Sequence, residues 1–303
     1  MLPMLEGFAG ALLGSLDGAA RATVASELTS LEQTVLARSD LRAVLTDTSI
    51  TGPARGQVLG QLLEGKVHVA TRRLAAYAAA SAPAQEVPHA IAELAITARS
   101  FNEVGTVELP SLGLMAARRR VSGFADALLE EIDVEGFAQI EDELFSWART
   151  VEGNVELRRL LLDRDAPLEA RLGLTEQLLA QRVRPVTLRI ARYVVEGGRP
   201  RDVVGTLDFL VDYVARARDW RVARVHTARA LDESSRDQLT RSLTTLTGKN
   251  VELQIAEDPA LLGGVLVEVG DLRLDATTRG RLGTLHDAMA SGRLYEASLN
   301  RND

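Results

Sequence analysis

Cysteine is absent from this chain of 303 residues. Its absence excludes a disulfide framework, a thiol nucleophile and a metal site with thiolate ligands. The four histidines lie far apart in the sequence, and no two of them have the i, i+3 or i, i+4 spacing that would place two ligands on one helical face. No G-x-x-x-x-G-K-[S/T] phosphate loop is present either. We therefore expect no catalytic residue, no metal site and no cofactor.

An excess of positive charge is also missing, because 35 Lys and Arg face 42 Asp and Glu, for a net charge of −7. Non-specific nucleic-acid binding needs a basic surface, so we expect no nucleic-acid partner. No apolar run approaches the roughly 20 residues that cross a bilayer. The first residues carry none of the early Lys or Arg of a secretory signal. These absences predict a soluble protein of the cell interior.

Aromatic residues make up only 4% of the chain, so its cores must consist mainly of Leu, Val, Ala and Ile. Such a composition favours helices.

Clustered charges are few. The basic run Arg118-Arg119-Arg120 is interpreted as a solvated first helical turn, with an acidic partner surface as the alternative. The acidic run Glu141-Asp142-Glu143 is expected on a solvated helix face, because nothing in the sequence indicates a cleft with two carboxylates of different pKa.

One stretch of sequence occurs twice. "GFAGALL" at residues 7–13 returns as "GFADALL" at 123–129, an offset of 116 residues. With that offset held and no gap, 27 of the 71 positions from 7 to 77 agree. A similarity of this length indicates the duplication of one domain of roughly 100 residues rather than a short solenoid repeat.

Each copy has the periodicity of helices. In the second copy, a first helix around 124–132 is followed by helices expected at about 135–150, 155–163, 167–181, 185–196 and 200–217. Six short antiparallel helices predict a compact bundle. Asp165 is expected to cap the helix that begins near Pro167. Gly197-Gly198 is expected to end the fifth helix in a left-handed conformation, and the first copy lacks these glycines.

The periodicity changes after about residue 218. Alternating apolar residues predict strands in "RVARVHTA" at 221–228, "VELQIAED" at 251–258 and "GVLVEV" at 264–269. Gly270-Asp271 predicts a tight hairpin turn into "LRLD" at 272–275. Helices are expected at about 232–247, with Gly248 at its end, and from near Thr277. The C-terminal part is therefore predicted to be a small α/β domain.

Two helices of the second copy are apolar over more than one face. The segments 124–132 and 185–196 carry apolar residues around a wide arc, whereas a surface helix of a small bundle buries a stripe of about 100° or somewhat more. The excess surface either lies at the centre of the bundle or receives a partner. An amphipathic helix in a groove is the natural guest, and the periodicity alone leaves both alternatives open.

The stretch 258–285, "DPALLGGVLVEVGDLRLDATTRGRLGTL", resembles the signature of the delta subunit of F-type ATP synthases, the family of the mitochondrial oligomycin-sensitivity-conferring protein. Upstream, "YVVEGGRPRDVV" at 193–204 resembles a weaker helix-turn element of that family, and Ala276 departs from its usual glycine. The resemblance covers about 118–293. The matching signature residues are Asp258, Pro259, Gly263, Gly264, Gly270, Asp271, Asp275, Arg279, Gly280 and Arg281.

The resemblance implies a non-catalytic subunit of the proton-translocating complex, peripheral on the cytoplasmic face of a bacterial membrane. In the family, the bundle caps the catalytic head, where helices one and five receive N-terminal helices of alpha subunits. The C-terminal domain holds the end of the b-subunit stalk, so that the stator resists rotor torque. Carried onto this chain, the implied alpha-helix groove consists of Phe124, Ala127, Leu128, Leu188, Ala191 and Val195. The small Ala127 and Ala191 are expected to let the guest helix approach closely.

The predicted fold is mainly α with a small α/β part: two tandem six-helix bundles followed by a C-terminal α/β domain. We expect a degenerate first bundle at 1–105, a linker at 106–117, the delta-type bundle at 118–217, the α/β domain at 218–293 and a tail at 294–303. The first copy is expected to lengthen or brace the stalk in a stand-alone long delta chain, and an excised part of a b–delta fusion is the alternative. The alternative function is a general helical adaptor unrelated to ATP synthase.

Overall fold

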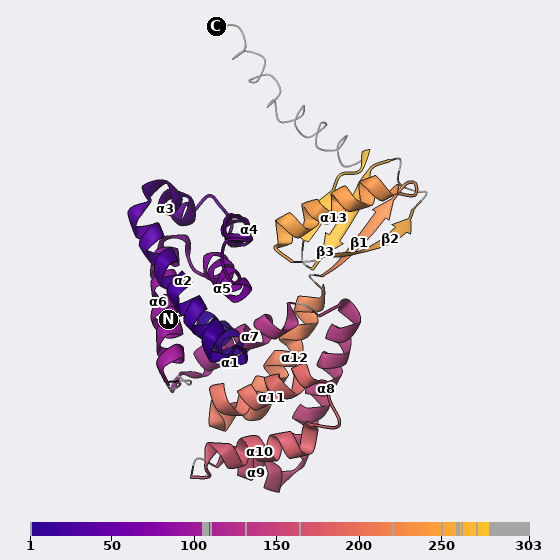
Figure 1. The fold of residues 1–303 in the computed structure, drawn as a ribbon. Helices are drawn as coiled ribbons and strands as arrows, with labels where there is room; N and C mark the ends of the chain where they lie inside the picture. Colours follow the sequence, from indigo (N-terminus) through magenta and orange to yellow (C-terminus); the bar gives the residue numbers. More distant parts are fainter. Residues whose placement is uncertain are drawn as a thin grey trace, which may run out of the picture. The chain divides into compact units, whose positions relative to one another are not determined.

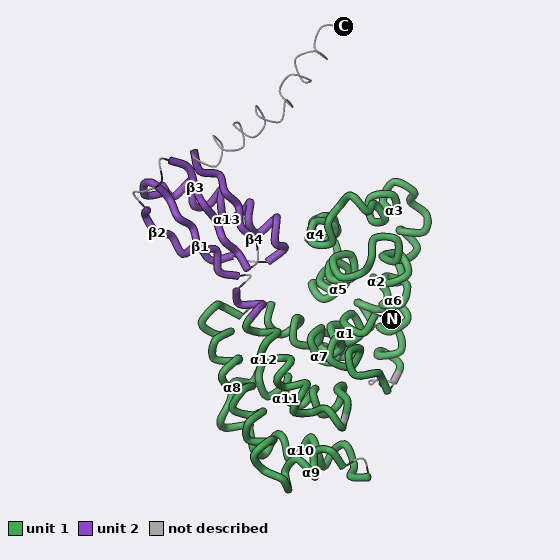
Figure 2. The backbone as a smooth tube through the Cα atoms, turned by 180° about the vertical axis from the view of Figure 1, so that it is seen from behind, with its two compact units in different colours: residues 1–215 green, residues 216–303 purple. Residues whose placement is uncertain are grey.

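The computed structural model describes residues 2–278 apart from 105–108, 110, 131, 164, 220, 250, 259–260, 262 and 271. The chain divides into two compact units, residues 1–215 and 216–303, which are coloured separately in Figure 2. Helices account for most of the described residues, and a single small sheet lies in the second unit. The prediction of a mainly α protein with a small C-terminal α/β part is therefore confirmed. Among the described residues, no helix has both the length and the apolar character needed to span a membrane.

The helices of the first unit occur in two sets, which we call the first and second repeats (Figure 1). The first repeat comprises α1 (Pro3–Ser15), α2 (Gly18–Ala37), α3 (Ser39–Thr46), α4 (Gly52–Leu63), α5 (Val69–Ser81) and α6 (Val87–Val104). The second comprises α7 (Leu114–Leu129), α8 (Val134–Gly153), α9 (Val155–Leu162), α10 (Leu168–Leu179), α11 (Pro185–Gly197) and α12 (Val203–Asp219). From α2 to α5, each helix has a counterpart whose two ends both lie 116 residues later, the offset of the sequence repeat.

The repeated sequence sets the same helix starts in both repeats. Asp17 caps α2 by accepting a hydrogen bond from the Ala20 amide at 2.8 Å, and Asp133 caps α8 by accepting one from the Gly136 amide at 2.7 Å. A side-chain oxygen at this position satisfies an amide that has no partner within the helix.

A second interaction that both repeats share fixes the start of the fifth helix. Glu27 of α2 accepts hydrogen bonds from the His68 amide and the Thr71 hydroxyl at the start of α5. Glu143 of α8 accepts the equivalent pair from the Arg184 amide and the Thr187 hydroxyl at the start of α11. The expectation of a solvated acidic face is therefore wrong for Glu143, because its carboxylate ties α8 to α11.

Two predicted helix ends differ in detail. The N-cap of α10 is Pro167 and not Asp165, and its side chain makes no capping hydrogen bond. The fifth helix does end at Gly197, but Gly198 has φ −79° and is extended, so the expected left-handed conformation is wrong. Glycine fits at 198 for another reason: a Cβ there would lie 2.2 Å from the Val194 carbonyl oxygen.

The second unit contains a four-stranded sheet and a helix, as the alternation of apolar residues predicts. The strands are β1 (Val222–Thr227), β2 (Glu252–Glu257), β3 (Val265–Val269) and β4 (Leu272–Asp275), in the order β2-β1-β3-β4. β1 and β2 are parallel and are connected through α13 (Glu233–Thr247), while β1–β3 and β3–β4 are antiparallel. The helix expected after Thr277 lies almost wholly outside the described residues.

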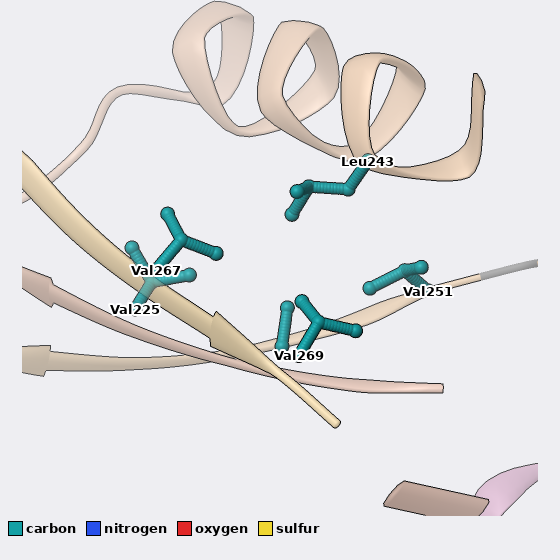
Figure 3. Close-up of a cluster of buried hydrophobic side chains, with 6 residues drawn as sticks. Val225, Leu243, Val251, Val267 and Val269 are labelled. Carbon is teal, nitrogen blue, oxygen red and sulfur yellow. The ribbon is translucent and has the colours of Figure 1, made fainter. Parts of the chain in front are cut away.

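The core of this unit lies between α13 and one face of the sheet (Figure 3). Leu243 of α13 points toward the strands, where Val225, Val267 and Val269 are buried on the same face. Two turns were predicted correctly: α13 ends at Gly248 with φ +69°, and Gly270 leads into β4 with φ +54°. Glycine adopts these left-handed conformations without the steric cost of a Cβ.

Candidate functional site

The two copies of the repeated stretch, residues 7–13 and 123–129, lie in helices that pack against each other. α1 packs along α7 (Figure 1). At two equivalent glycines, each helix lies directly against the backbone of the other. A Cβ on Gly7 would lie 1.8 Å from the carbonyl oxygen of Arg120, and a Cβ on Gly123 would lie 1.9 Å from that of Met4. Arg120 and Met4 are themselves 116 residues apart. The contact is therefore reciprocal, and the helix backbones meet where neither residue carries a side chain.

The same reciprocity holds for the aromatic residues. Phe8 of α1 stacks on Tyr77 of α5, and Phe124 of α7 stacks on Tyr193 of α11, each pair with ring centroids 3.8 Å apart. Each stack joins the first helix of a repeat to the fifth. The first and fifth helices thus form one face in each repeat, and the first helix of the other repeat lies on it.

An arginine on the fifth helix of each repeat bonds to the first helix of the other repeat. Arg73 of α5 donates to the carbonyl oxygen of Ala127 at 2.7 Å and forms an ion pair with Glu130, both at the end of α7. Its counterpart Arg189 of α11 donates to the carbonyl oxygen of Ala11 in α1 at 3.4 Å, and burial lowers the pKa of this guanidinium. α1 therefore packs along α7 and also contacts α11.

The predicted groove residues are covered in this arrangement. Phe124 is 8% exposed, Ala127 5%, Ala191 1% and Val195 2%, while Leu128 and Leu188 are half-buried. The structure packs α7 against α11, the two helices that the family resemblance implies as the sides of the groove. The residue of α7 that permits the close approach of α1 is Gly123, which the sequence analysis did not single out.

The basic run at the start of α7 is not a solvated turn. Arg120 is 2% exposed and donates to the carbonyl oxygen of Gly197 at 2.8 Å. It also forms an ion pair with Glu6 of α1 at 3.5 Å. Arg118 pairs with Asp202 at 2.9 Å, and only Arg119 is exposed. The predicted solvated turn is therefore wrong for two of the three arginines, which join α7 to its neighbours.

The one residue that differs between the two copies of the repeated stretch has a structural consequence. Asp126 of α7 accepts hydrogen bonds from the hydroxyls of Tyr77 and Tyr213, each at 2.7 Å. Its counterpart in α1 is Gly10, which offers no acceptor. Tyr193, the counterpart of Tyr77, is 5% exposed, and its buried hydroxyl has no hydrogen-bond partner among the described residues. The two repeats thus differ at this point, where α7 offers an acceptor to the tyrosine of the fifth helix and α1 does not.

Replacing Gly10 with aspartate should supply the missing acceptor. The Tyr193 hydroxyl lies 3.6 Å from the position of a Cβ on Gly10, a distance that suits a carboxylate one bond further on. We expect Gly10→Asp to be more stable than Gly10→Ala by about 1 kcal/mol, the net value of a typical hydrogen bond. Gly10→Ala is the matched control, because it adds the same Cβ beside the Tyr193 hydroxyl but no acceptor. Chemical denaturation measures the difference, and equal stability of the two variants would contradict this account.

The same tyrosines make the fold sensitive to alkali. Burial raises the pKa of Tyr77, with the Asp126 charge adding to the effect, and burial also raises the pKa of Tyr193. A phenol that keeps its proton longer in the fold than in the unfolded chain stabilises the fold below pH about 10. Above that pH the free energy of unfolding should fall by up to about 1.4 kcal/mol per pH unit for each such tyrosine. Denaturation at pH 9 to 11 tests this, and Tyr77→Phe should flatten the decline.

The C-terminal signature lies around the end of β2 and the two ends of β3. The Asp258 amide donates to the carbonyl oxygen of Thr227 at 2.8 Å, which continues the pairing of β2 with β1. Asp275 accepts hydrogen bonds from the amide and the hydroxyl of Thr277, and these bonds lower the pKa of its carboxyl. Pro259, Asp271, Arg279, Gly280 and Arg281 lie outside the described residues.

The paired glycines of the signature are needed for their geometry. Gly263 has φ +149° and Gly264 has φ +82°, and a Cβ on Gly264 would lie 2.3 Å from the carbonyl oxygen of Ala276. Ala276 itself, at the position that departs from the family, has no positive φ. The departure is therefore compatible with the turn.

Gly264→Ala should destabilise the C-terminal unit by about 2 kcal/mol, because it combines a positive φ with a backbone clash. Gly18→Ala is a suitable control, since it lies in the other unit with no atom within 4 Å of its Cβ position. Hydrogen exchange should report faster exchange in β1 to β4 for Gly264→Ala alone. Unchanged exchange in the sheet would contradict the assigned geometry.

The important residues that the sequence analysis missed are the two crossing glycines, Arg73, Arg189 and the acceptor Asp126. A signal for them was present in the alignment of the repeats. In that alignment Gly7 corresponds to Gly123, Arg73 corresponds to Arg189, and Gly10 corresponds to Asp126. What the sequence could not supply is that Gly7 and Gly123 lie at one helix crossing and that the two arginines and Asp126 reach the other repeat.

Comparison with known proteins gives a family for this arrangement. The family model described as ATP synthase delta (OSCP) subunit matches residues 121–289, more than half of the chain. The ATP synthase subunit delta of Nocardia farcinica is 34% identical over 287 residues, which cover 94% of this chain and 95% of that protein. The corresponding protein of Salinispora arenicola is 33% identical over 275 residues, with 90% of each chain covered. Alignments of this length include most of the first repeat, and the chain belongs to the ATP synthase delta (OSCP) subunit family.

Proposed function

We propose that this chain acts as the delta subunit in the peripheral stalk of an F-type ATP synthase. In this role it links the catalytic head to the membrane part of the complex and resists rotor torque during proton-driven ATP synthesis. The observation that carries the proposal is the family match over 121–289, together with relatives of the same length named ATP synthase subunit delta. The chain would reach the cytoplasmic face of the membrane as a peripheral part of the complex and would catalyse no reaction itself.

The partner surfaces follow from the two parts of the chain. We assign 118–217 to a six-helix bundle of the delta type, with a degenerate bundle at 1–105, a linker at 106–117, an α/β domain at 218–293 and a tail at 294–303. The alpha-subunit N-terminal helix would bind to α7 and α11 at Phe124, Ala127, Leu128, Leu188, Ala191 and Val195. The apolar and small character of these residues supports a helix as guest. The α/β domain would hold the b-type stalk helices, and the first repeat would brace them.

A pull-down tests the assignment directly. A tagged form of this chain, expressed in its native organism and purified from detergent-solubilised membranes, should enrich the alpha, beta and b subunits of ATP synthase, identified by mass. An untagged strain processed in parallel is the control. Enrichment of other proteins without these subunits would overturn the proposal in favour of a general helical adaptor.

A further inference from the structure

α1 packs along α7 and contacts α11, the two helices to which the alpha-subunit helix is proposed to bind. Three contacts place it there. Gly7 lies against the Arg120 carbonyl of α7, Glu6 pairs with the Arg120 guanidinium, and the Ala11 carbonyl accepts from Arg189 of α11. A helix that binds the same groove in trans would need the volume that α1 occupies. The two cannot be bound together.

We propose that α1 is a displaceable plug: the α7/α11 groove accepts a partner helix only when α1 leaves it. For the identity of that partner the inference rests on the proposed function, which places an alpha-subunit helix in this groove. Because α1 is part of the same chain, its effective concentration at the groove is on the order of millimolar. A partner helix therefore binds with an affinity reduced by the small fraction of molecules in which the groove is open.

The contact of α1 with α11 has features of an exchangeable interface. The hydroxyl of Tyr193, which faces Gly10 of α1, has no hydrogen-bond partner in the part of the chain that the structure describes, although the equivalent hydroxyl in the first repeat is bonded to Asp126. The hydrogen bond from Arg189 to Ala11 is 3.4 Å long, against 2.7 Å for its counterpart from Arg73 to Ala127. α1 is thus held less tightly by α11 than α7 is held by α5. A guest with an acceptor at the Gly10 position would satisfy the free hydroxyl.

The contacts also define the guest. It should be an amphipathic helix with glycine or alanine where Gly7 meets the Arg120 carbonyl. A carboxylate one residue earlier would pair with Arg120, as Glu6 does. A polar acceptor three residues after the small residue would reach Tyr193, as Asp126 reaches Tyr77 in the first repeat. This pattern predicts which partner helices compete with α1 and which do not.

The test uses the full-length chain and two fluorescent peptides: residues 2–16 of this chain, which comprise α1, and the N-terminal helix of the alpha subunit from the same organism. Gly7→Leu should expel α1 from the groove and leave the residues of α7 and α11 intact. We expect it to raise the affinity for both peptides at least tenfold over the wild type. Gly10→Asp, which should hold α1 more tightly, is expected to lower the affinity for both.

Gly14→Ala is the matched control in α1, because nothing lies within 4 Å of a Cβ at that position, and it should leave both affinities unchanged. Circular dichroism and hydrogen exchange of α8 to α11 check that each variant is folded. If Gly7→Leu does not fold, the decrease expected for Gly10→Asp still decides the question. Equal binding of the α1 peptide to the wild type, Gly7→Leu and Gly10→Asp would overturn the plug.

Peptide binding and the pull-down together distinguish a failure of the plug proposal from a failure of the proposed function. If the alpha peptide binds all variants with equal affinity while the pull-down enriches ATP synthase, the plug is wrong and the proposed function stands. If the α1 peptide follows the expected order while the pull-down enriches no ATP synthase subunit, the plug stands as a property of this chain and the proposed function is wrong.

Discussion

Replacing Gly123 with alanine is expected to lower the free energy of unfolding of the helical unit by about 3 kcal/mol, at the upper end of the usual cost of overpacking. The added methyl would lie 1.9 Å from the Met4 carbonyl oxygen and 2.6 Å from its carbon. Both atoms belong to the backbone of α1, so no side chain can turn aside to make room. The whole of α1 must move, and it carries Gly7, Glu6 and Ala11 away from their contacts with α7 and α11.

The measurement is a pair of thermal denaturation curves. A loss of about 3 kcal/mol corresponds to a fall in Tm of roughly 6–12 °C for a unit of this size. Gly173→Ala is the control, because it makes the same change in the interior of α10 with nothing within 4 Å. That control should be neutral or stabilising by up to about 1 kcal/mol, since alanine favours helix more than glycine does. Equal Tm values for the two variants would mean that α1 and α7 do not approach as described.

Much of the local structure follows from the sequence because its causes are local. Asp17 and Asp133 start helices as N-caps, Gly248 ends α13 in a left-handed conformation, and the alternating valines around 265–269 form a half-buried strand. Each of these depends on neighbouring residues and on one preferred backbone geometry. The duplication also predicts that the helices of one repeat return in the other.

The face formed by α7 and α11 was only half predictable, for a physical reason. The wide apolar arc of 124–132 indicates that something covers this helix, but an arc cannot say whether the cover comes from the same chain or from another. The cover in this structure is α1, which lies more than 100 residues earlier in the sequence. Likewise, Arg118 and Arg120 look like surface charges in the sequence. They become structural because Asp202, Gly197 and Glu6 reach them from other helices.

Asp126→Ala is expected to cost about 3 kcal/mol in the free energy of unfolding of the helical unit. The carboxylate accepts hydrogen bonds from Tyr77 of α5 and Tyr213 of α12, so it joins one helix of each repeat to α7. A bond to a charged acceptor contributes roughly 1.5–3 kcal/mol, and two phenols lose theirs in one substitution. Asp126→Asn should cost about half as much, because the amide oxygen still accepts while the charge is gone.

The effect of Asp126 can be separated from the mere loss of a surface charge. Asp212→Ala removes an exposed carboxylate from α12 and should change stability by less than about 0.5 kcal/mol. A double-mutant cycle with Tyr77→Phe should give a coupling energy of about 1–2 kcal/mol, because the two residues share one bond. A coupling near zero would show that Asp126 stabilises the fold without Tyr77. Gly10 stands in α1 at the position of Asp126, so a coupling of the expected size would measure a contact that α7 makes with α5 and that α1 does not make with α11.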